Sequence, residues 1–192
     1  MVLLTETIES FQNHFLIAMP GLEDPFFNRS VTYICEHNQD GAMGLIVNQP
    51  VEFSLLKLLE QIEITPPQGA KLDNKPVYAG GPVATDRGFV LHTPQKGWKS
   101  SLQLSDDIMV TTSKDILAAF GSDSAPHDYL LTLGYAGWEA GQLEEEIAEN
   151  SWLTIPADAD ILFHTPSNER WEKATSKLGI DMWQLSSQAG HA

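Results

Sequence analysis

The stretch VTYICEHNQDGAMGLIVN, residues 31–48, decides the fold of this chain. Two apolar runs, 31–36 and 42–48, flank a polar segment that closes with Asp40 and Gly41. An Asp-Gly step between apolar runs is a strong hairpin signal, although this loop is longer than the two-residue ideal. The stretch therefore predicts an antiparallel pair of strands.

Strand-like and helix-like segments surround this hairpin in irregular order. We expect further strands at 15–18, 77–79, 88–92, 108–112, 129–133, 152–155 and 161–163, and we expect 88–92 to return beside 77–79. Helical spacing indicates helices at 55–62, 114–120, 142–149 and 167–179, the first two with Ser54 and Ser113 as N-caps. A doubly wound sheet is excluded because strands and helices do not alternate regularly. Residues 1–192 are therefore predicted to form a single α+β domain with a mixed, strongly bent β-sheet and flanking helices.

Composition and charge narrow the class of protein. The 192 residues include 11 basic and 26 acidic side chains, which give a formal charge of −15. This charge repels phosphate backbones and no cluster of Lys and Arg opposes it, so nucleic-acid binding is not expected without a partner. The N-terminal segment lacks the basic region of a secretory signal, and no apolar run reaches the roughly 20 residues of a membrane span. We expect a cytoplasmic protein.

Motifs for nucleotides, metals and common nucleophiles are absent, and neither a cofactor nor a metal is expected. The sequence has no Gly-x-Gly-x-x-Gly, no Walker motif, no His-Glu-x-x-His and no Gly-x-Ser-x-Gly, and its lone Cys35 cannot build a Cys-rich zinc site. Cys35 and His37 could still share a strand face, and Glu36 or His37 beside an arginine could activate water. The alternative is that Cys35 is a buried apolar residue and that His37 is solvated at the turn.

Polar side chains are concentrated at the ends of the predicted hairpin, where they could line a ligand cleft: Arg29, Ser30, Glu36, His37, Asn38 and Asn48. In the alternative interpretation, Arg29 pairs with a carboxylate and the asparagines cap turns. A second group could cradle an anion, because glycines let backbone N–H groups converge and arginine supplies a fork of donors: Gly80, Gly81, Arg87 and His92. A tight turn with positive φ explains the same glycines without a ligand.

A glycine-rich corner at 134–137 forms the third part of the candidate cleft. It places aromatic residues beside a strongly acidic run, in the order Tyr135, Trp138, Gln142 and Glu144. Such a corner would suit a cationic partner. In the alternative, the aromatic side chains are core, the glycines permit a sharp bend from strand to helix, and the glutamates form a solvated helix face.

The motifs together resemble the uncharacterised bacterial YqgE/AlgH family. The resemblance runs in order along nearly the whole chain, through segments 14–20, 24–25, 29–31, 33–38, 41–45, 48–50, 80–83, 87–92, 133–138, 141–144, 150–153, 161–163, 170–171 and 178–181. It implies an α+β domain with a bifurcated β-sheet folded into a pseudo-barrel. It implies little about chemistry, although one branch of the family is named as a regulator of alginate synthesis.

Three functional hypotheses remain open at this point. The first is a non-enzymatic binding or regulatory protein whose cleft recognises a protein partner or a small ligand. The second is a small-molecule hydrolase with Glu36 or His37 as general base, which requires these groups to converge in one pocket. The third is transcriptional regulation by direct DNA contact, which the charge opposes. The sequence predicts no oligomeric state.

Overall fold

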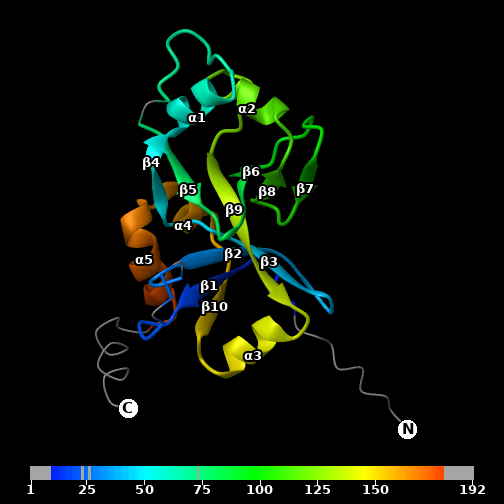
Figure 1. Cartoon of the computed structure of the whole chain (residues 1–192), viewed down its shortest axis with the longest axis vertical. Coiled ribbons are helices and arrows are strands. Elements are labelled where there is room, and N and C mark those ends of the chain that lie inside the picture. The colour runs from blue at the N-terminus through cyan, green and yellow to red at the C-terminus, as the bar shows by residue number, and fades with distance from the viewer. Residues whose placement is uncertain (1–9, 23, 26, 73, 180–192) are drawn as a thin grey trace.

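A strongly bent, mixed β-sheet forms the body of the molecule (Figure 1). The computed structural model describes residues 10–179 except 23, 26 and 73, so Ile180 and Asp181 of the last family motif lie outside it. Within the described residues the sheet has ten strands: β1 His14–Ala18, β2 Val31–Asn38, β3 Gly41–Ile46, β4 Pro50–Ser54, β5 Pro76–Ala79, β6 Val83–His92, β7 Ser101–Gln103, β8 Met109–Thr111, β9 Tyr129–Glu139 and β10 Trp152–Pro156. The predicted α+β class with a mixed, bent sheet is confirmed.

Short helices flank the sheet at both ends and along one side (Figure 1). They are α1 Leu55–Gln61, α2 Asp115–Ala119, α3 Gln142–Ala148, α4 Ala159–His164 and α5 Arg170–Lys177, with a 3₁₀ turn at Ser167–Glu169. Helices α1 and α2 lie at one end and α3 at the other, while α5 packs against β1 and β2. None of the helices in the described part of the chain is long and apolar enough to cross a membrane.

The predicted hairpin is formed by β2 and β3. Their antiparallel register pairs Thr32 with Ile46 and Asn38 with Gly41, and a register shift between Ile34 and Glu36 marks a bulge. Gly41 has φ +135, and a Cβ atom there would lie 2.2 Å from the carbonyl oxygen of Trp138 on β9. Only glycine fits this position, because both the backbone conformation and the contact with β9 exclude a side chain. The hairpin prediction is confirmed.

The long strand β9 joins the two halves of the sheet. Its first half pairs with β5 in parallel and with β6 antiparallel, and its second half pairs with β3. Residues 134–137 therefore continue the strand instead of turning a corner, and the predicted pairing of 88–92 with 77–79 is wrong because β9 lies between β5 and β6. Gly134, at φ +78, lets the chain pass where a Cβ atom would lie 2.5 Å from the carbonyl oxygen of Gly81.

Two local predictions are wrong for identifiable reasons. Residues 161–163 belong to α4, not to a strand, because Asp158 caps the segment by accepting from the backbone N–H of Asp160 and Ile161. Helix α2 is not capped by Ser113. The hydroxyl of Ser113 instead accepts from the N–H of Ser100 and donates to the Asp115 carboxylate. The predicted N-cap at Ser54 is confirmed, since its side chain accepts from the N–H of Lys57.

Candidate functional site

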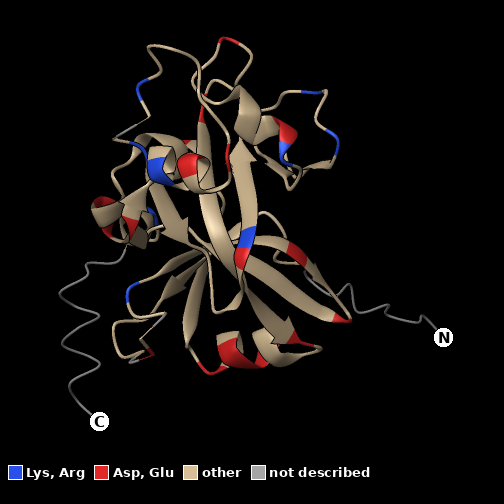
Figure 2. Ribbon diagram, turned by 45° about the horizontal axis from the view of Figure 1, so that its top comes forward, with Lys and Arg blue, Asp and Glu red and all other residues tan. Residues whose placement is uncertain are grey.

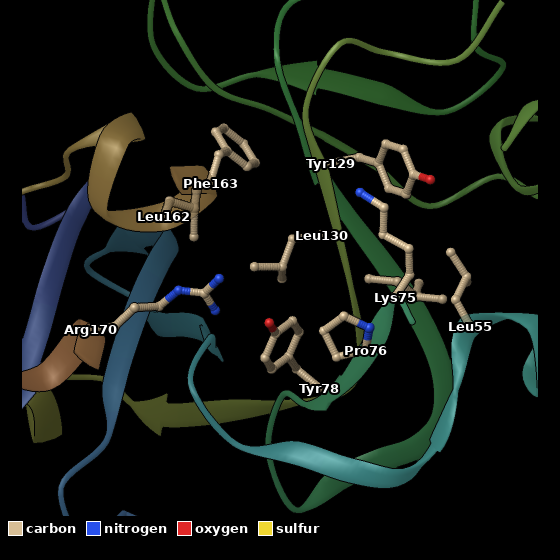
Figure 3. A pocket seen from close by; sticks show the side chains of 10 residues that line it. Leu55, Lys75, Pro76, Tyr78, Tyr129, Leu130, Leu162, Phe163 and Arg170 are labelled. Carbon is tan, nitrogen blue, oxygen red and sulfur yellow. The ribbon is translucent and has the colours of Figure 1, made fainter. Parts of the chain in front are cut away.

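A cavity of about 150 Å³ lies between β5, the first residues of β9, and helices α4 and α5 (Figure 3). Its walls are mostly apolar or aromatic, and they are supplied by Leu55, Pro76, Tyr78, Tyr129, Leu130, Leu131, Leu162 and Phe163. Two cationic side chains, Arg170 and Lys75, complete the lining from opposite sides. The site therefore combines a small chamber, lined mainly by apolar and aromatic residues, with positive charge.

Arg170 is the central feature of this cavity. It is the first residue of α5 and is only 5% exposed. Its Nε donates to the carbonyl of Thr165 at 3.0 Å, its Nη1 donates to the carbonyl of Val47, and its guanidinium carbon lies 5.0 Å from the centre of the Tyr78 ring. These contacts fix the plane of the guanidinium group and turn its remaining donors toward the cavity (Figure 3).

The charge of Arg170 has no acidic counterpart in the structure. None of the ion pairs among residues 10–179, leaving out 23, 26 and 73, involves Arg170, and its Nη2 has no hydrogen-bond acceptor within those residues. A buried charge normally has a partner of opposite charge, because leaving it unpaired is costly. The guanidinium can therefore donate to an anionic group placed in the cavity, with the fork geometry that suits a carboxylate or phosphate.

Lys75 marks the opposite end of the cavity. Its Nζ lies 5.2 Å from the centre of the Tyr129 ring, which stacks in turn on Phe120 with ring centres 4.1 Å apart. Burial raises the pKa of Tyr129, so this phenol stays neutral and adds no negative charge to the site. The lysine is exposed, and it forms a cationic rim in contrast to the buried cation at Arg170.

A separate polar cluster joins the β2–β3 hairpin to helix α3. His37 is buried, its Nδ1 accepts from the N–H of Phe11 at 2.8 Å, and its Nε2 contacts the Glu144 carboxylate. Because Nδ1 is an acceptor, Nε2 carries the proton and donates to Glu144. Partial burial opposes ionisation of Glu144, but hydrogen bonds from its own backbone N–H and from His37 outweigh it and lower the pKa. The expectation of a solvated His37 is wrong.

Two other predicted cleft residues, Trp138 and Gln142, hold α3 against the sheet. The indole Nε1 atoms of Trp138 and Trp152 donate to the same oxygen of Glu146, at 2.6 and 3.2 Å. Gln142 donates to the other oxygen of Glu146 and accepts from the N–H of Glu139. The glutamates of α3 are therefore not simply a solvated face, although acidic residues do gather over this end of the molecule (Figure 2).

The geometry required for hydrolysis by Glu36 or His37 is not formed. These neighbours on β2 differ in exposure, with Glu36 exposed and bonded to Asn38, while His37 is buried against Glu144. A hollow of about 250 Å³ is lined by Glu36, Asn38 and Asp40, and no arginine is among its lining residues. Cys35 is buried, which together with the charge of Glu36 raises the pKa of its thiol to about 12 and keeps it protonated.

The remaining hairpin residues of the predicted cleft lie beside α5. Asn48 accepts from the N–H of Val31 and donates to the carbonyl of Arg29, so its amide links the two strand ends. Arg29, at φ +52, places its guanidinium 5.4 Å from the centre of the Trp171 ring. Among the described residues it forms no ion pair with a carboxylate, although the alternative interpretation required one. Ser30 is fully buried and its hydroxyl has no partner in the described structure.

The four residues predicted to cradle an anion, Gly80, Gly81, Arg87 and His92, lie in different places and serve the packing of the sheet. Gly80 and Gly81 pack against β9, where a Cβ on Gly81 would lie 2.1 Å from the carbonyl carbon of Tyr135, so close approach explains these glycines. Arg87 lies over Phe89 and lines an open groove near α1 and α2. His92 is fully buried between Thr111 and the Thr93 carbonyl, and burial lowers its pKa. The fourteen candidate residues therefore do not line one common cleft.

Arg170, Lys75 and Tyr78 were not among the residues that sequence reasoning selected. The sequence does contain one indication of an interior role for Arg170. On a helix, Arg170 shares a stripe with Ala174 and Leu178, and this stripe packs inward next to Trp171. An arginine on the buried stripe of an amphipathic helix is unusual and points to an interior role. Among the described residues, no group of three or more His, Cys, Asp or Glu side chains is arranged to hold a metal ion.

The fold and the cavity together define an α+β protein with a bent mixed sheet and a small, positively charged interior site. The model of the family described as AlgH-like matches residues 15–183, so the chain belongs to the AlgH-like family. A UPF0301 protein of Idiomarina loihiensis is 60% identical over 96% of this chain and 100% of that relative, and one of Serratia proteamaculans is 58% identical over 95% and 100%.

Solved structures agree with this assignment. The solution structure of the AlgH protein from Pseudomonas aeruginosa matches with a TM-score of 0.78 at 46% identity, over 97% of this chain and 98% of that one. A crystal structure of a protein from Corynebacterium diphtheriae matches with a TM-score of 0.71 at 18% identity, over 93% and 92%. The first supports family and fold, and the second shows the fold alone.

Proposed function

We propose that this protein is a non-enzymatic binding protein that holds a small organic anion in the cavity beside Arg170. The observation that carries the proposal is the buried guanidinium, which has no acidic partner among the described residues and faces a chamber lined mainly by apolar and aromatic residues. An anionic group on the ligand would supply the missing counter-charge, and the aromatic and aliphatic walls would receive its apolar part.

The size of the cavity limits the ligand. A volume of about 150 Å³ is below the 300–1,000 Å³ of typical drug-sized sites. The ligand is therefore a small carboxylate or phosphate with a short apolar body, and not a nucleotide. Lys75 at the rim adds a second cation that favours an anion on entry.

A binding role is favoured over catalysis because the candidate catalytic groups do not converge. Glu36 and His37 contact Asn38 and Glu144 and are not among the residues that line the cavity, which contains no carboxylate, histidine, serine or cysteine. Of the other lining residues that could act as base or nucleophile, Lys75 lies over the ring of Tyr129, and burial raises the pKa of that phenol. In this proposal the protein acts in the cytoplasm, and a regulatory effect passes through a protein partner instead of direct DNA contact, because the charge of −15 opposes the latter.

The test uses benzoate and its neutral isostere benzamide as probes, with binding followed by calorimetry and by backbone NMR shifts of residues around the cavity. We expect benzoate to bind and benzamide to bind at least tenfold more weakly, since hydrogen bonds to a charged group contribute about 1.5–3 kcal/mol. Equal binding of the two probes, or shifts confined to other parts of the molecule, would contradict the proposal.

Three variants locate the site. Arg170→Gln removes the charge, and Leu130→Trp fills the chamber while leaving Arg170 in place, so both should abolish or strongly weaken benzoate binding. Arg87→Gln removes an exposed arginine from a different groove and is the matched control, expected to bind as the wild type does. Circular dichroism establishes that each variant is folded. Loss of binding in Arg87→Gln but not in Leu130→Trp would place the site elsewhere.

A further inference from the structure

A charged cluster outside the cavity connects two of its walls. His164, the last residue of α4, places Nε2 at 2.9 Å from Oδ2 of Asp128 and Nδ1 at 3.1 Å from Oδ1 of Asp160. His127 also contacts Asp128, with Nδ1 at 3.2 Å, and Lys173 of α5 lies 3.6 Å from Asp160. These four side chains are the charged groups that surround His164 directly or through its carboxylate partners in the described part of the chain.

The arrangement fits the doubly protonated form of His164. Each ring nitrogen faces a carboxylate oxygen, and a carboxylate can only accept hydrogen bonds. A neutral imidazole has one N–H, so its other nitrogen would turn a lone pair toward a carboxylate. The imidazolium form has two N–H groups and satisfies both contacts. The geometry therefore links the charge of His164 to the contact between α4 and Asp128.

This contact bears directly on the cavity. Leu162 and Phe163 precede His164 and line one wall, while Tyr129 and Leu130 follow Asp128 and line the facing wall (Figure 3). Asp128 is a fixed point, because its backbone carbonyl and N–H both bond to Thr93 at the end of β6. Tying His164 to Asp128 consequently holds α4 and its two wall residues against the start of β9.

Building on the proposed function, we propose that protonated His164 holds α4 against β9 in the form that binds the anion, and that loss of this proton releases the wall and weakens binding. The site is thereby sensitive to pH, with its ligand held more tightly on the acidic side. The effect is transmitted through the His164–Asp128 contact and not through the charge of His164 acting at a distance.

The direction of the pH effect follows from the contacts of His164. Hydrogen bonds to Asp128 and then Asp160, with the charge of these groups, raise its pKa above the ordinary histidine value. Partial burial opposes ionisation of Asp128, but its contacts with His164 and His127 outweigh this and lower its pKa. A raised histidine pKa means that the tie is complete below the ordinary value and is lost as the pH rises through the raised value. Guanidinium and carboxylate groups keep their charge over the pH range in which a histidine titrates.

The experiment measures benzoate affinity from about pH 6 to about pH 9, which brackets an elevated histidine pKa. For the wild type we expect affinity to fall by a factor of about two to five, the range that an exposed ion pair contributes. His164→Gln and Asp128→Asn should bind benzoate with nearly constant affinity, at the wild-type alkaline level. His127→Gln, which removes the neighbouring exposed histidine, should keep the wild-type dependence.

Asp128→Asn separates the two possible origins of a pH effect. It keeps His164 and its contact with Asp160 but breaks the tie to β9. If Asp128→Asn retained the full wild-type dependence, the charge of His164 would act at a distance and the proposed tie would be refuted. An unchanged dependence in His164→Gln would assign the effect to another group and would also overturn the proposal.

Hydrogen exchange tests the tie without any ligand. The N–H of Leu162 bonds to the carbonyl of Asp158 at 3.0 Å, so its protection reports whether α4 stays in place. After correction for intrinsic exchange, this protection should fall on the alkaline side in the wild type and be independent of pH in His164→Gln and Asp128→Asn. Absence of benzoate binding at every pH would refute the proposed function, while constant protection in the wild type would refute the tie itself.

Discussion

Replacing Glu146 tests whether the aromatic corner at α3 serves the fold. One oxygen of this carboxylate accepts from the indoles of Trp138 and Trp152, and the other accepts from Gln142. Glu146→Ala loses these three hydrogen bonds to a charged acceptor, each of which contributes about 1.5–3 kcal/mol in favourable cases. Because Glu146 is only half-buried, we expect the free energy of unfolding to fall by about 3 kcal/mol in total. Glu146→Gln keeps one acceptor and should lose about 1–2 kcal/mol.

The matched control for this prediction is Glu145→Ala on the same helix. Glu145 is exposed, and the change should alter the free energy of unfolding by less than about 0.5 kcal/mol, as surface substitutions usually do. Urea denaturation followed by tryptophan fluorescence and circular dichroism measures both variants. If Glu146→Ala were as stable as Glu145→Ala, Trp138 and Gln142 would not be held by Glu146, and their interpretation as structural residues would be refuted.

Two further predictions concern the glycines and the lone cysteine. Gly41→Ala, which places Cβ 2.2 Å from a carbonyl oxygen of β9, should cost about 2–4 kcal/mol more than Gly141→Ala. Gly141 also has a positive φ, +79 against +135 at Gly41, but nothing lies within 4 Å of a Cβ atom placed there, so equal urea midpoints would contradict the close contact at Gly41. Because burial raises the pKa of the Cys35 thiol to about 12, iodoacetamide at about pH 8 should label Cys35 only after unfolding, as mass spectrometry can show. Rapid labelling of the folded protein would refute the buried position.

The parts of the fold that sequence predicted are those set by local chemistry. The β2–β3 hairpin follows from Asp40 and Gly41 between apolar runs, and the start of α1 follows from Ser54 as its N-cap. The errors arise where contacts between residues far apart in sequence decide the secondary structure or the strand pairing. Residues 161–163 form a run too short to distinguish a helix from a strand, and β5 and β6 are separated by β9, which comes much later in the chain.

The candidate site, like the fold, could not be predicted where it depends on contacts between distant parts of the chain. His37 was expected to be solvated because it lies near a turn, yet it is buried by Glu144, which lies 107 positions away in sequence. The cavity was missed because it is assembled from β5, β9, α4 and α5, and apart from the position of Arg170 on the inner stripe of its helix no local pattern marks it. The polar motifs of the sequence lie mostly at strand ends and turns, while Arg170, which lines the cavity, is buried in the interior.

The charge distribution reconciles an acidic protein with the proposed anion site. A charge of −15 spread over the surface repels a polyanion such as nucleic acid, which must approach many surface groups at once. A small anion within the cavity is close to only a few groups, because salt screens charges beyond about 8 Å under physiological conditions. The nearest of these is a guanidinium that is largely shielded from solvent, where its attraction is stronger than it would be at the surface. In the proposed function, the acidic surface and the cationic interior would therefore act together, excluding large anions while leaving the cavity to small ones.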